Sequence, residues 1–409
     1  MTTFAQDGGT LPVGLGDLGG DRFDRLGLIQ WWDQSIISRT KVVVVGAGAL
    51  GNEILKNLAL LGFRQILVVD MDRIELSNLS RSVLYRPADV GAPKAATAAA
   101  ATQAIYEYAV VHFINGSILH DVGLGVFSWA DVVLAGLDNR EARLWINRSC
   151  WKMNRPWIDG AIEGLSGVAR VFLPGSPPCY ECTLGEVDWR ILANRLSCNL
   201  LTRTEIEGGR TPTTPTIASI IGGVQVQEAV KLIHGQPVLA GKGYVFEGTH
   251  HTSYVVEYTE TEECMSHYSA PAPKNLEGAS EDWTLSRLFE RAQQDLDAVE
   301  IVLEFSRDVI WKLRCPQCGE EEETLAPVGA VSLEQGRCSR DGTVREAIVQ
   351  HSYDGSGPLG GKRWSEVGLP LYDCVTARSA SDEVSYLFAA DAKRVLGPLA
   401  GGADASSSG

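Results

Sequence analysis

A glycine-rich turn at 46–51, with the sequence GAGALG, is the first stretch whose residue types and spacing could do chemistry. It stands between a β-branched, strand-like run and an apolar, helix-like segment. Gly46, Gly48 and Gly51 would allow a tight turn and a close approach of backbone to phosphate, and the helix N-terminus would offer N–H donors. Asp70 ends the next apolar run, where a carboxylate can accept hydrogen bonds from ribose hydroxyls. The turn alone is equally typical of a nicotinamide enzyme.

Polar residues that suit a triphosphate follow the predicted strands. They comprise three carboxylates, an amide and two cations, namely Asp70, Asp72, Asn78, Arg81, Lys94 and Asp138. Open α/β sheets bind ligands at the carboxyl ends of their strands, which is where these loops would lie. Arginine and lysine pair with phosphate, and carboxylate oxygens are ligands that magnesium takes. Nicotinamide chemistry needs none of these groups, so the set favours ATP and Mg²⁺.

Two short knuckles supply four ligands of the types that zinc prefers. The first contains Cys179 and Cys182, and the second contains Cys264 and His267. We expect these four side chains to hold one structural Zn²⁺. The rival arrangement pairs the first knuckle with the later stretch Cys315-Pro-Gln-Cys318.

That later stretch is itself typical of half a zinc ribbon. A complete ribbon would need a second Cys-x-x-Cys, but the sequence offers Cys338-Ser-Arg-Asp341. Cys374 or His351 could also complete such a site. A second metal group involving Cys315, Cys318 and Cys338 therefore stays open at this point.

Cys198 stands apart from both groups. Arg195 and Arg203 lie close to it in the sequence and could lower the pKa of its thiol, which would make it a nucleophile. The alternative is a packing residue on an apolar helix face beside Leu196 and Leu200.

The order of the expected elements predicts an α/β fold with a doubly wound, mostly parallel, Rossmann-like sheet. Short apolar strands alternate with helices, which is the pattern of parallel sheets. We expect strands at 41–45, 66–69, 110–114, 132–135, 168–173 and 254–258, and helices at 23–32, 52–61, 94–108, 141–152 and 217–234.

The chain divides by composition into five parts. We expect a flexible arm at 1–20, a nucleotide-binding domain with both knuckles at 21–270, and a linker at 269–276. A smaller, α+β domain with a candidate zinc ribbon should follow at 275–398, and a disordered tail at 399–409.

The composition limits the partners. The 409 residues are 44% hydrophobic and 21% charged, as in ordinary globular proteins. A formal net charge of −15 makes nucleic acid and anionic membranes poor partners. The N-terminus lacks the basic and apolar regions of a signal peptide, and polar residues interrupt the apolar stretch at 42–63, so we expect no membrane span. Nine cysteines, with two Cys-x-x-Cys pairs, favour metal binding in a reducing cytoplasm.

The residues at about 21–267 resemble the ThiF/MoeB and ubiquitin-activating enzyme superfamily, whose members adenylate the C-terminal glycine of a ubiquitin-like β-grasp protein. The motif D-x-D-x-I-E-x-S-N-L-x-R, which begins at Asp70, is specific to that superfamily. By this resemblance Asp70 would hold ribose, and Asp138 would hold magnesium. Asn78, Arg81 and Lys94 would contact the phosphates.

The resemblance also implies partners. The segment Arg22-Phe-Asp-Arg25 matches one whose second arginine reaches into the partner subunit's ATP site, so Arg25 is the candidate finger of a homodimer. Cys198 would take the activated modifier as a thioester and pass it to a conjugating enzyme. With its extra C-terminal domain, the chain is most similar to compact bacterial ubiquitin-activating-like members. The alternatives are a sulfur-carrier-protein adenylyltransferase of the MoeB/ThiF type and a catalytically silent partner subunit.

Overall fold

The computed structural model describes residues 20–196 and 212–401, which contain a large sheet of eight strands in the order β3-β2-β1-β4-β5-β6-β7-β8. The first five strands in that order pair in parallel, and the last three are added antiparallel. The strands are β1 Lys41–Val45, β2 Gln65–Asp70, β3 Val110–Asn115, β4 Val132–Gly136, β5 Trp157–Glu163, β6 Ser166–Phe172, β7 Lys242–Glu247 and β8 Thr252–Glu257. This mostly parallel start confirms the predicted fold class.

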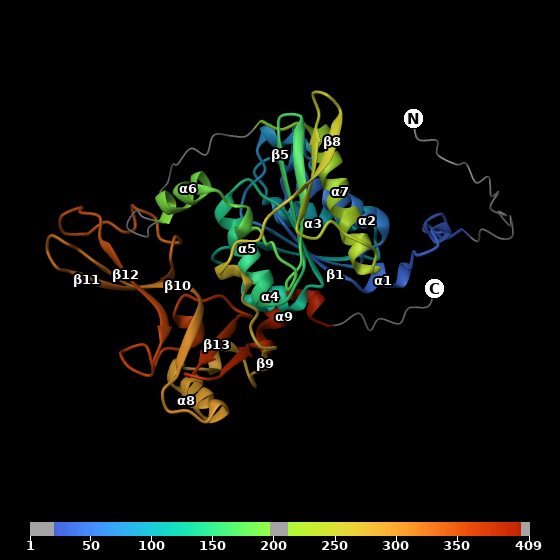
Figure 1. Cartoon of the computed structure of the whole chain (residues 1–409). Helices are drawn as coiled ribbons and strands as arrows, with labels where there is room; N and C mark the ends of the chain where they lie inside the picture. Colours follow the sequence, from blue (N-terminus) through green and yellow to red (C-terminus); the bar gives the residue numbers. More distant parts are fainter. Residues whose placement is uncertain (1–19, 197–211, 402–409) are drawn as a thin grey trace.

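Helices cover both faces of the large sheet (Figure 1). One face carries α2 Ala49–Leu61, α3 Lys94–Ile105 and α7 Pro215–Ile233. The other face carries α4 Leu124–Trp129 and α5 Arg140–Lys152. Two more helices, α1 Gln34–Arg39 and α6 Glu186–Leu196, flank these layers.

The β-branched run of β1 explains this layering. Successive side chains of a strand point to opposite faces, so a strand that is apolar throughout must be covered on both. Val42 and Val44 pack among the residues of α2, α3 and α7, and Val43 and Val45 pack among those of α4 and α5. All four valines are at most 2% exposed.

A second sheet of six strands lies in the C-terminal part. Its order is β11-β10-β13-β14-β9, and β12 also pairs with β10. Trp364, Tyr386 and Phe388 are fully buried in its core. The elements are β9 Lys274–Asn275, α8 Leu285–Leu296, β10 Val302–Arg314, β11 Glu321–Pro327, β12 Glu346–Tyr353, β13 Cys374–Arg378, β14 Glu383–Leu387 and α9 Ala392–Leu396.

The segment expected to be a linker is partly a strand. β9 pairs in parallel with β14, and the Leu276 N–H donates to the Leu387 carbonyl at 2.9 Å. The sequence analysis assigned this segment to a linker because it contains two prolines. An edge strand tolerates neighbouring proline, so the two prolines do not prevent β9 from forming.

The two sheets are joined by buried polar contacts. The Leu124 N–H donates to the Asp373 carboxylate at 2.8 Å. The Arg307 guanidinium donates to the Leu119 and Val122 carbonyls at 2.6 and 2.7 Å. The C-terminal part therefore helps to cover the large sheet.

The start of the predicted tail needs correction. A 3-10 turn spans Gly397–Ala400, and Leu399 is only 3% exposed. Leu399 packs into the core of the large sheet together with Leu396 of α9. Residues 399 and 400 therefore belong to the fold. The prediction missed Leu399 because the residues that follow it are of low complexity.

Other local predictions also differ from the structure. The helix expected at 23–32 is a single 3-10 turn at Leu26–Leu28, and α1 starts later because Asp33 caps it by accepting from the Ser35 N–H at 2.8 Å. Strands β5 and β7 were missing from the prediction because glycines interrupt their apolar pattern.

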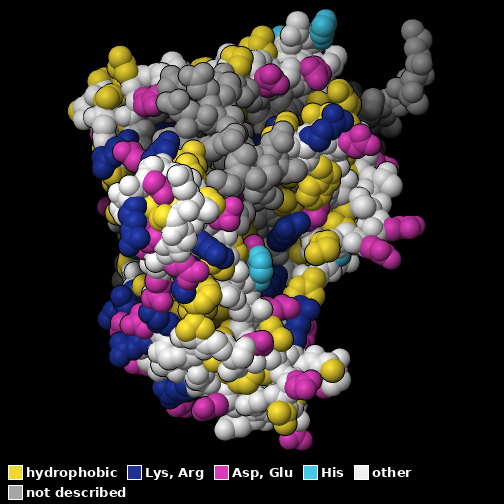
Figure 2. All heavy atoms as spheres, turned by 90° about the vertical axis from the view of Figure 1, so that its left-hand side faces the viewer, with side chains coloured by type: hydrophobic (Ala, Val, Ile, Leu, Met, Phe, Trp, Pro, Cys, Tyr) yellow, Lys and Arg dark blue, Asp and Glu magenta, His cyan; other side chains and the backbone are white. Residues whose placement is uncertain are grey.

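No helix in the described residues is long and apolar enough to cross a bilayer. The view in Figure 2 shows one face of the molecule, with acidic and basic side chains interspersed and apolar ones scattered among them. The net negative charge is therefore not gathered into one patch on that face.

Candidate functional site

The glycine turn links β1 to α2 at the carboxyl end of the parallel strands. Gly46 has a φ of +92°, and a Cβ there would lie 2.5 Å from the Gly136 carbonyl oxygen of β4. A Cβ at Gly51 would lie 1.8 Å from the Gly46 carbonyl oxygen. By contrast, a Cβ at Gly48 would meet no protein atom within 4 Å. Two of the glycines are thus required by packing, and Gly48 leaves an open approach to the backbone.

Buried side chains that the sequence analysis did not single out hold this turn. The Asn52 amide donates to the Ala47 and Gly48 carbonyls at 2.8 and 3.0 Å, and its oxygen accepts from the Leu84 N–H at 2.8 Å. The Tyr85 hydroxyl donates to the Ala47 carbonyl at 2.6 Å. Asn52 is fully buried, so its amide must find hydrogen-bond partners inside the protein. The available signal was a polar residue directly after the glycine turn.

Asp70 ends β2 beside the turn. Its two carboxylate oxygens accept from the Ala47 and Asp72 N–H groups, each at 2.7 Å. These bonds orient the carboxylate, while burial raises its pKa above the ordinary aspartate value. The side chain is therefore positioned at the strand end, where ribose binding was predicted.

The predicted cations lie in the loops that follow. The Lys94 ammonium pairs with the Asp72 carboxylate at 2.8 Å, and the Lys94 side chain is only 12% exposed. The Arg81 guanidinium donates to the Ser77 carbonyl at 2.9 Å, and the Asn78 oxygen accepts from the Glu75 N–H at 2.9 Å. Both cations therefore border the same opening with their side chains oriented by protein groups.

One pocket of about 1090 Å³ brings the predicted residues together. Its lining includes Gly46, Gly48, Asp70, Asp72, Asn78, Arg81, Lys94 and Asp138. Asp138 is exposed in the loop after β4, so its carboxylate can reach a metal ion in the pocket. Carboxylate oxygens and retained waters are what Mg²⁺ takes, and the donor set fits that ion. The volume suits a nucleotide together with part of a second substrate.

A buried charge cluster forms another part of the pocket wall. The Asp159 carboxylate accepts from Arg143 Nε at 2.9 Å and from Arg170 Nε at 3.0 Å, and Asp159 is fully buried. Burial acts to raise the pKa of Asp159, but the two guanidiniums outweigh it and hold the pKa below its ordinary value. The sequence analysis missed this cluster, although an aspartate inside an apolar strand was a signal for it.

Among the described residues, two residues predicted for the nucleotide site, Gly51 and Arg25, do not line this pocket. Arg25 is exposed directly before the 3-10 turn Leu26–Leu28 and does not line the pocket of its own chain. Cys198 lies outside the described residues. Their predicted roles stay predictions.

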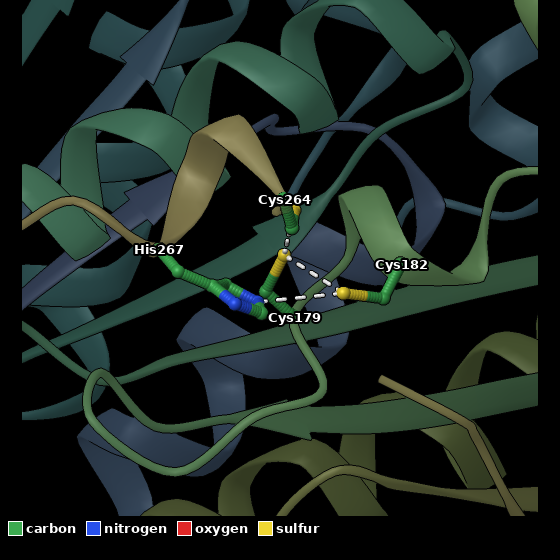
Figure 3. A group of neighbouring side chains, drawn as sticks. All are labelled: Cys179, Cys182, Cys264 and His267. Atoms are coloured by element: carbon green, nitrogen blue, oxygen red, sulfur yellow. Dashed lines mark hydrogen bonds between the residues drawn. The ribbon is translucent and has the colours of Figure 1, made fainter. Parts of the chain in front are cut away.

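The first two knuckles meet in one cluster, as Figure 3 shows. Cys179 Sγ lies 3.7 Å from both Cys182 Sγ and Cys264 Sγ, and Cys182 Sγ lies 3.4 Å from His267 Nε2. Tetrahedral zinc with Zn–S of about 2.3 Å and Zn–N of about 2.0 Å gives ligand separations of about 3.5–3.8 Å. The four side chains therefore fit a tetrahedral metal ion.

The surroundings of His267 also suit a metal ligand. Its Nδ1 faces the Glu260 carboxylate at 3.5 Å, and its ring stacks on Trp151 with centroids 4.5 Å apart. Ligating histidines commonly use the second ring nitrogen in this way. The rival pairing of the first knuckle with Cys315 and Cys318 is wrong, because those two cysteines belong to a different cluster.

Part of the chain is similar in sequence to known proteins. A SUMO-activating enzyme subunit, uba-2, of Caenorhabditis elegans is 42% identical over 147 residues, which cover 36% of this chain and 25% of that protein. The NEDD8-activating enzyme E1 catalytic subunit of Arabidopsis thaliana is 42% identical over 159 residues, which cover 35% of this chain and 34% of that protein. The matched part thus spans 25% and 34% of the length of these two relatives.

Solved structures of MccB from E. coli share the fold. The complex with ATP matches with a TM-score of 0.51 at 20% identity, covering 61% of this chain and 75% of that one. The complex with MccA matches with a TM-score of 0.50 at 21% identity, covering 61% of this chain and 74% of that one. The model of the ThiF family matches residues 23–267, which is more than half of the chain. The chain belongs to the ThiF family.

Proposed function

We propose that this protein activates a ubiquitin-like β-grasp protein by adenylating its C-terminal glycine with ATP and Mg²⁺. The observation that carries the proposal is the single pocket that joins the glycine turn, Asp70, Arg81, Lys94 and Asp138. A nicotinamide enzyme would have no use for these cations and this exposed carboxylate.

The chemistry follows from the groups present. The terminal carboxylate of the modifier attacks the α-phosphate of ATP, and the bond to pyrophosphate breaks. Arg81 and Lys94 would compensate the charge on the phosphate oxygens, and positioned cations are the effective catalysts of such a transfer. Asp138 would hold Mg²⁺, which when bound would neutralise further phosphate charge. Asp70 would orient the nucleotide through its ribose.

Room for the modifier's tail exists beside the nucleotide half of the pocket. The same pocket continues along Ser166 and Val168 of β6, Glu247 of β7 and Tyr258, just beyond β8. An extended peptide of small residues could lie along this wall with its carboxylate directed at the α-phosphate. This continuity supports a protein terminus over a free small acid as the second substrate.

The later steps rest on residues beyond the pocket. We propose that Cys198 takes the modifier from the adenylate as a thioester, with AMP leaving, and that a conjugating enzyme accepts it. We propose a homodimer in which the exposed Arg25 reaches the partner's pocket, as the resemblance of the segment Arg22-Phe-Asp-Arg25 implies. The four ligands at Cys179, Cys182, Cys264 and His267 would hold a structural Zn²⁺. Their free thiols suit the reducing cytoplasm.

ATP–pyrophosphate exchange tests the adenylation step. The wild-type chain is incubated with ATP, labelled pyrophosphate and a β-grasp protein from the same genome that ends in glycine. We expect exchange to be lost in Asp138→Ala and kept in the matched control Glu107→Ala, whose carboxylate is exposed outside the pocket. Equal exchange in both variants would contradict the proposed role, and no exchange in any of the three would favour a silent partner subunit.

A second readout separates conjugation from sulfur transfer. After incubation with ATP, a reductant-sensitive adduct with the mass of the whole modifier should form on the wild type and be absent from Cys198→Ser. Exchange without such an adduct would overturn the thioester step and favour a sulfur-carrier-protein adenylyltransferase.

A further inference from the structure

The C-terminal part contains a second cluster of metal-type ligands, far along the chain from the first. Cys315, Cys318, Cys338 and Asp341 present ligand atoms that all lie within 4.8 Å of one another. Cys315 and Cys338 are buried, and the other two are exposed. The cluster lies between the end of β10 and the stretch before β12, a part of the second sheet that projects away from the large sheet in Figure 1.

The two halves of this cluster have the same backbone structure. In the first, the Cys315 N–H donates to the Glu320 carbonyl at 2.8 Å, and the Gly319 N–H donates to the Cys315 carbonyl at 3.0 Å. In the second, the N–H of Cys338 donates to the carbonyl five residues later, at 343, also at 2.8 Å, and the Gly342 N–H donates back to the Cys338 carbonyl at 2.9 Å.

The glycines of these two turns match as well. Gly319 has a φ of +74° and Gly342 a φ of +73°. Each glycine directly follows the fourth residue of its turn, which is Cys318 in the first and Asp341 in the second. The turns are therefore two copies of one knuckle, and Asp341 stands at the position that the fourth cysteine of a ribbon would occupy.

The separations fit tetrahedral coordination. Cys318 Sγ lies 3.6 Å from Cys338 Sγ, and Cys315 Sγ lies 3.4 Å from Asp341 Oδ2. For zinc with Zn–S of about 2.3 Å and Zn–O of about 2.0 Å, the expected separations are about 3.8 Å for S–S and about 3.5 Å for S–O. Cys374 is buried in β13, and His351 pairs with Asp308 at 2.7 Å, so neither completes the group.

Arginine–glutamate pairs border the cluster. Arg345 is 3% exposed, and its guanidinium lies 3.4 Å from the Glu320 carboxylate, which in turn lies 3.4 Å from Cys338 Sγ. Arg340 approaches the other oxygen of Glu320 at 3.3 Å. Arg345 also pairs with Glu322. The two arginines therefore balance the charge of these neighbouring glutamates and reduce the repulsion between the Glu320 carboxylate and the sulfur ligands.

The apolar cluster that includes the end of β10 has few fully buried members. Ile310, Leu313 and Val331 are the buried members of this apolar cluster. Small units with so little apolar burial are commonly held by a metal or a disulfide. We propose that Cys315, Cys318, Cys338 and Asp341 form a structural Zn²⁺ site that ties the end of β10 to the segment before β12.

Metal content of the full-length protein, measured by inductively coupled plasma mass spectrometry, tests the site. We expect two zinc ions per chain in the wild type and one in Cys318→Ser. The Cys182→Ser variant should also keep one, and the double variant none. A wild type with one zinc that Cys182→Ser removes and Cys318→Ser leaves in place would overturn the proposal.

Asp341 itself is tested by the rate at which a chelator removes the second zinc. Loss of a ligand should speed release at least about tenfold in Asp341→Ala, since removal of mere supporting groups already costs about 10–100-fold in metal affinity. Asp341→Cys should restore slow release. Glu334→Gln is the matched control that should keep two zinc ions with wild-type release, because its side chain is exposed and outside the cluster. An Asp341→Ala variant with wild-type release, or an Asp341→Cys variant that fails to retain the second zinc, would contradict the assignment. Neither readout depends on adenylation.

Discussion

Gly48 and Gly51 occupy one turn but should respond to alanine in opposite ways. At Gly51 the added Cβ would lie 1.8 Å from the Gly46 carbonyl oxygen and 2.8 Å from its carbon. Both are backbone atoms, so the contact can be relieved only by moving the turn or the start of α2. At Gly48 the Cβ would meet nothing within 4 Å, and the φ of −76° is ordinary for any residue.

The expected magnitudes follow from these contacts. Overpacking costs about 1–3 kcal/mol, and a 1.8 Å backbone contact places Gly51→Ala near about 3 kcal/mol of lost unfolding free energy. Gly48 caps α2 without a side-chain hydrogen bond, so Gly48→Ala should cost less than about 1 kcal/mol. Its methyl group would instead stand where phosphate must approach, and we expect nucleotide affinity to fall at least about tenfold, or about 1.4 kcal/mol.

Urea denaturation and calorimetric titration with ATP separate the two effects. Gly51→Ala should unfold at lower urea with an unchanged slope, whereas Gly48→Ala should unfold like the wild type and bind ATP weakly. The reasoning would be refuted by a Gly51→Ala protein as stable as the wild type. It would also be refuted by a Gly48→Ala protein that binds ATP with wild-type affinity.

Three further outcomes are expected. Asp159→Ala should lose about 3–5 kcal/mol of unfolding free energy in urea because Arg143 and Arg170 keep buried, unpaired charge, and a loss below about 1 kcal/mol would contradict this. Leu399→Ala should cost about 2–5 kcal/mol by the same measurement, and no loss would argue against its anchoring role. Burial raises the pKa of Asp70, so its carboxylate takes up a proton at a higher pH than an ordinary aspartate. The ratio of the ATP affinity of the wild type to that of Asp70→Asn should therefore fall as the pH drops through that pKa. An affinity ratio that stays constant with pH would exclude ribose binding by the carboxylate.

The parallel part of the fold could be predicted from short-range patterns. The valine run of β1 and the glycine turn after it predict one strand, one helix and the edge of the sheet at which the loops lie. Because these signals are local, they predict that the loops with Asp70, Lys94 and Asp138 lie at one edge of the sheet, and all three residues line one pocket. The cysteine spacing similarly predicted which knuckles contain metal-type ligands.

Long-range pairing could not be predicted in this way. The Arg143–Asp159–Arg170 cluster joins a helix to two strands. An aspartate inside an apolar strand indicates a buried charge, but the sequence does not show which cations pair with it. The equivalence of the two C-terminal knuckles depends on hydrogen bonds and glycine φ angles, so Asp341 could not be chosen over Cys374 from spacing alone.

The most direct test of the central claim is ATP–pyrophosphate exchange with two forms of one β-grasp protein from the same genome. One form ends in its native glycine, and the other lacks that single residue. The account predicts exchange with the intact form and none with the shortened one, because only the terminal glycine carboxylate would reach the α-phosphate. Equal exchange with both forms, or with no β-grasp protein present, would contradict it.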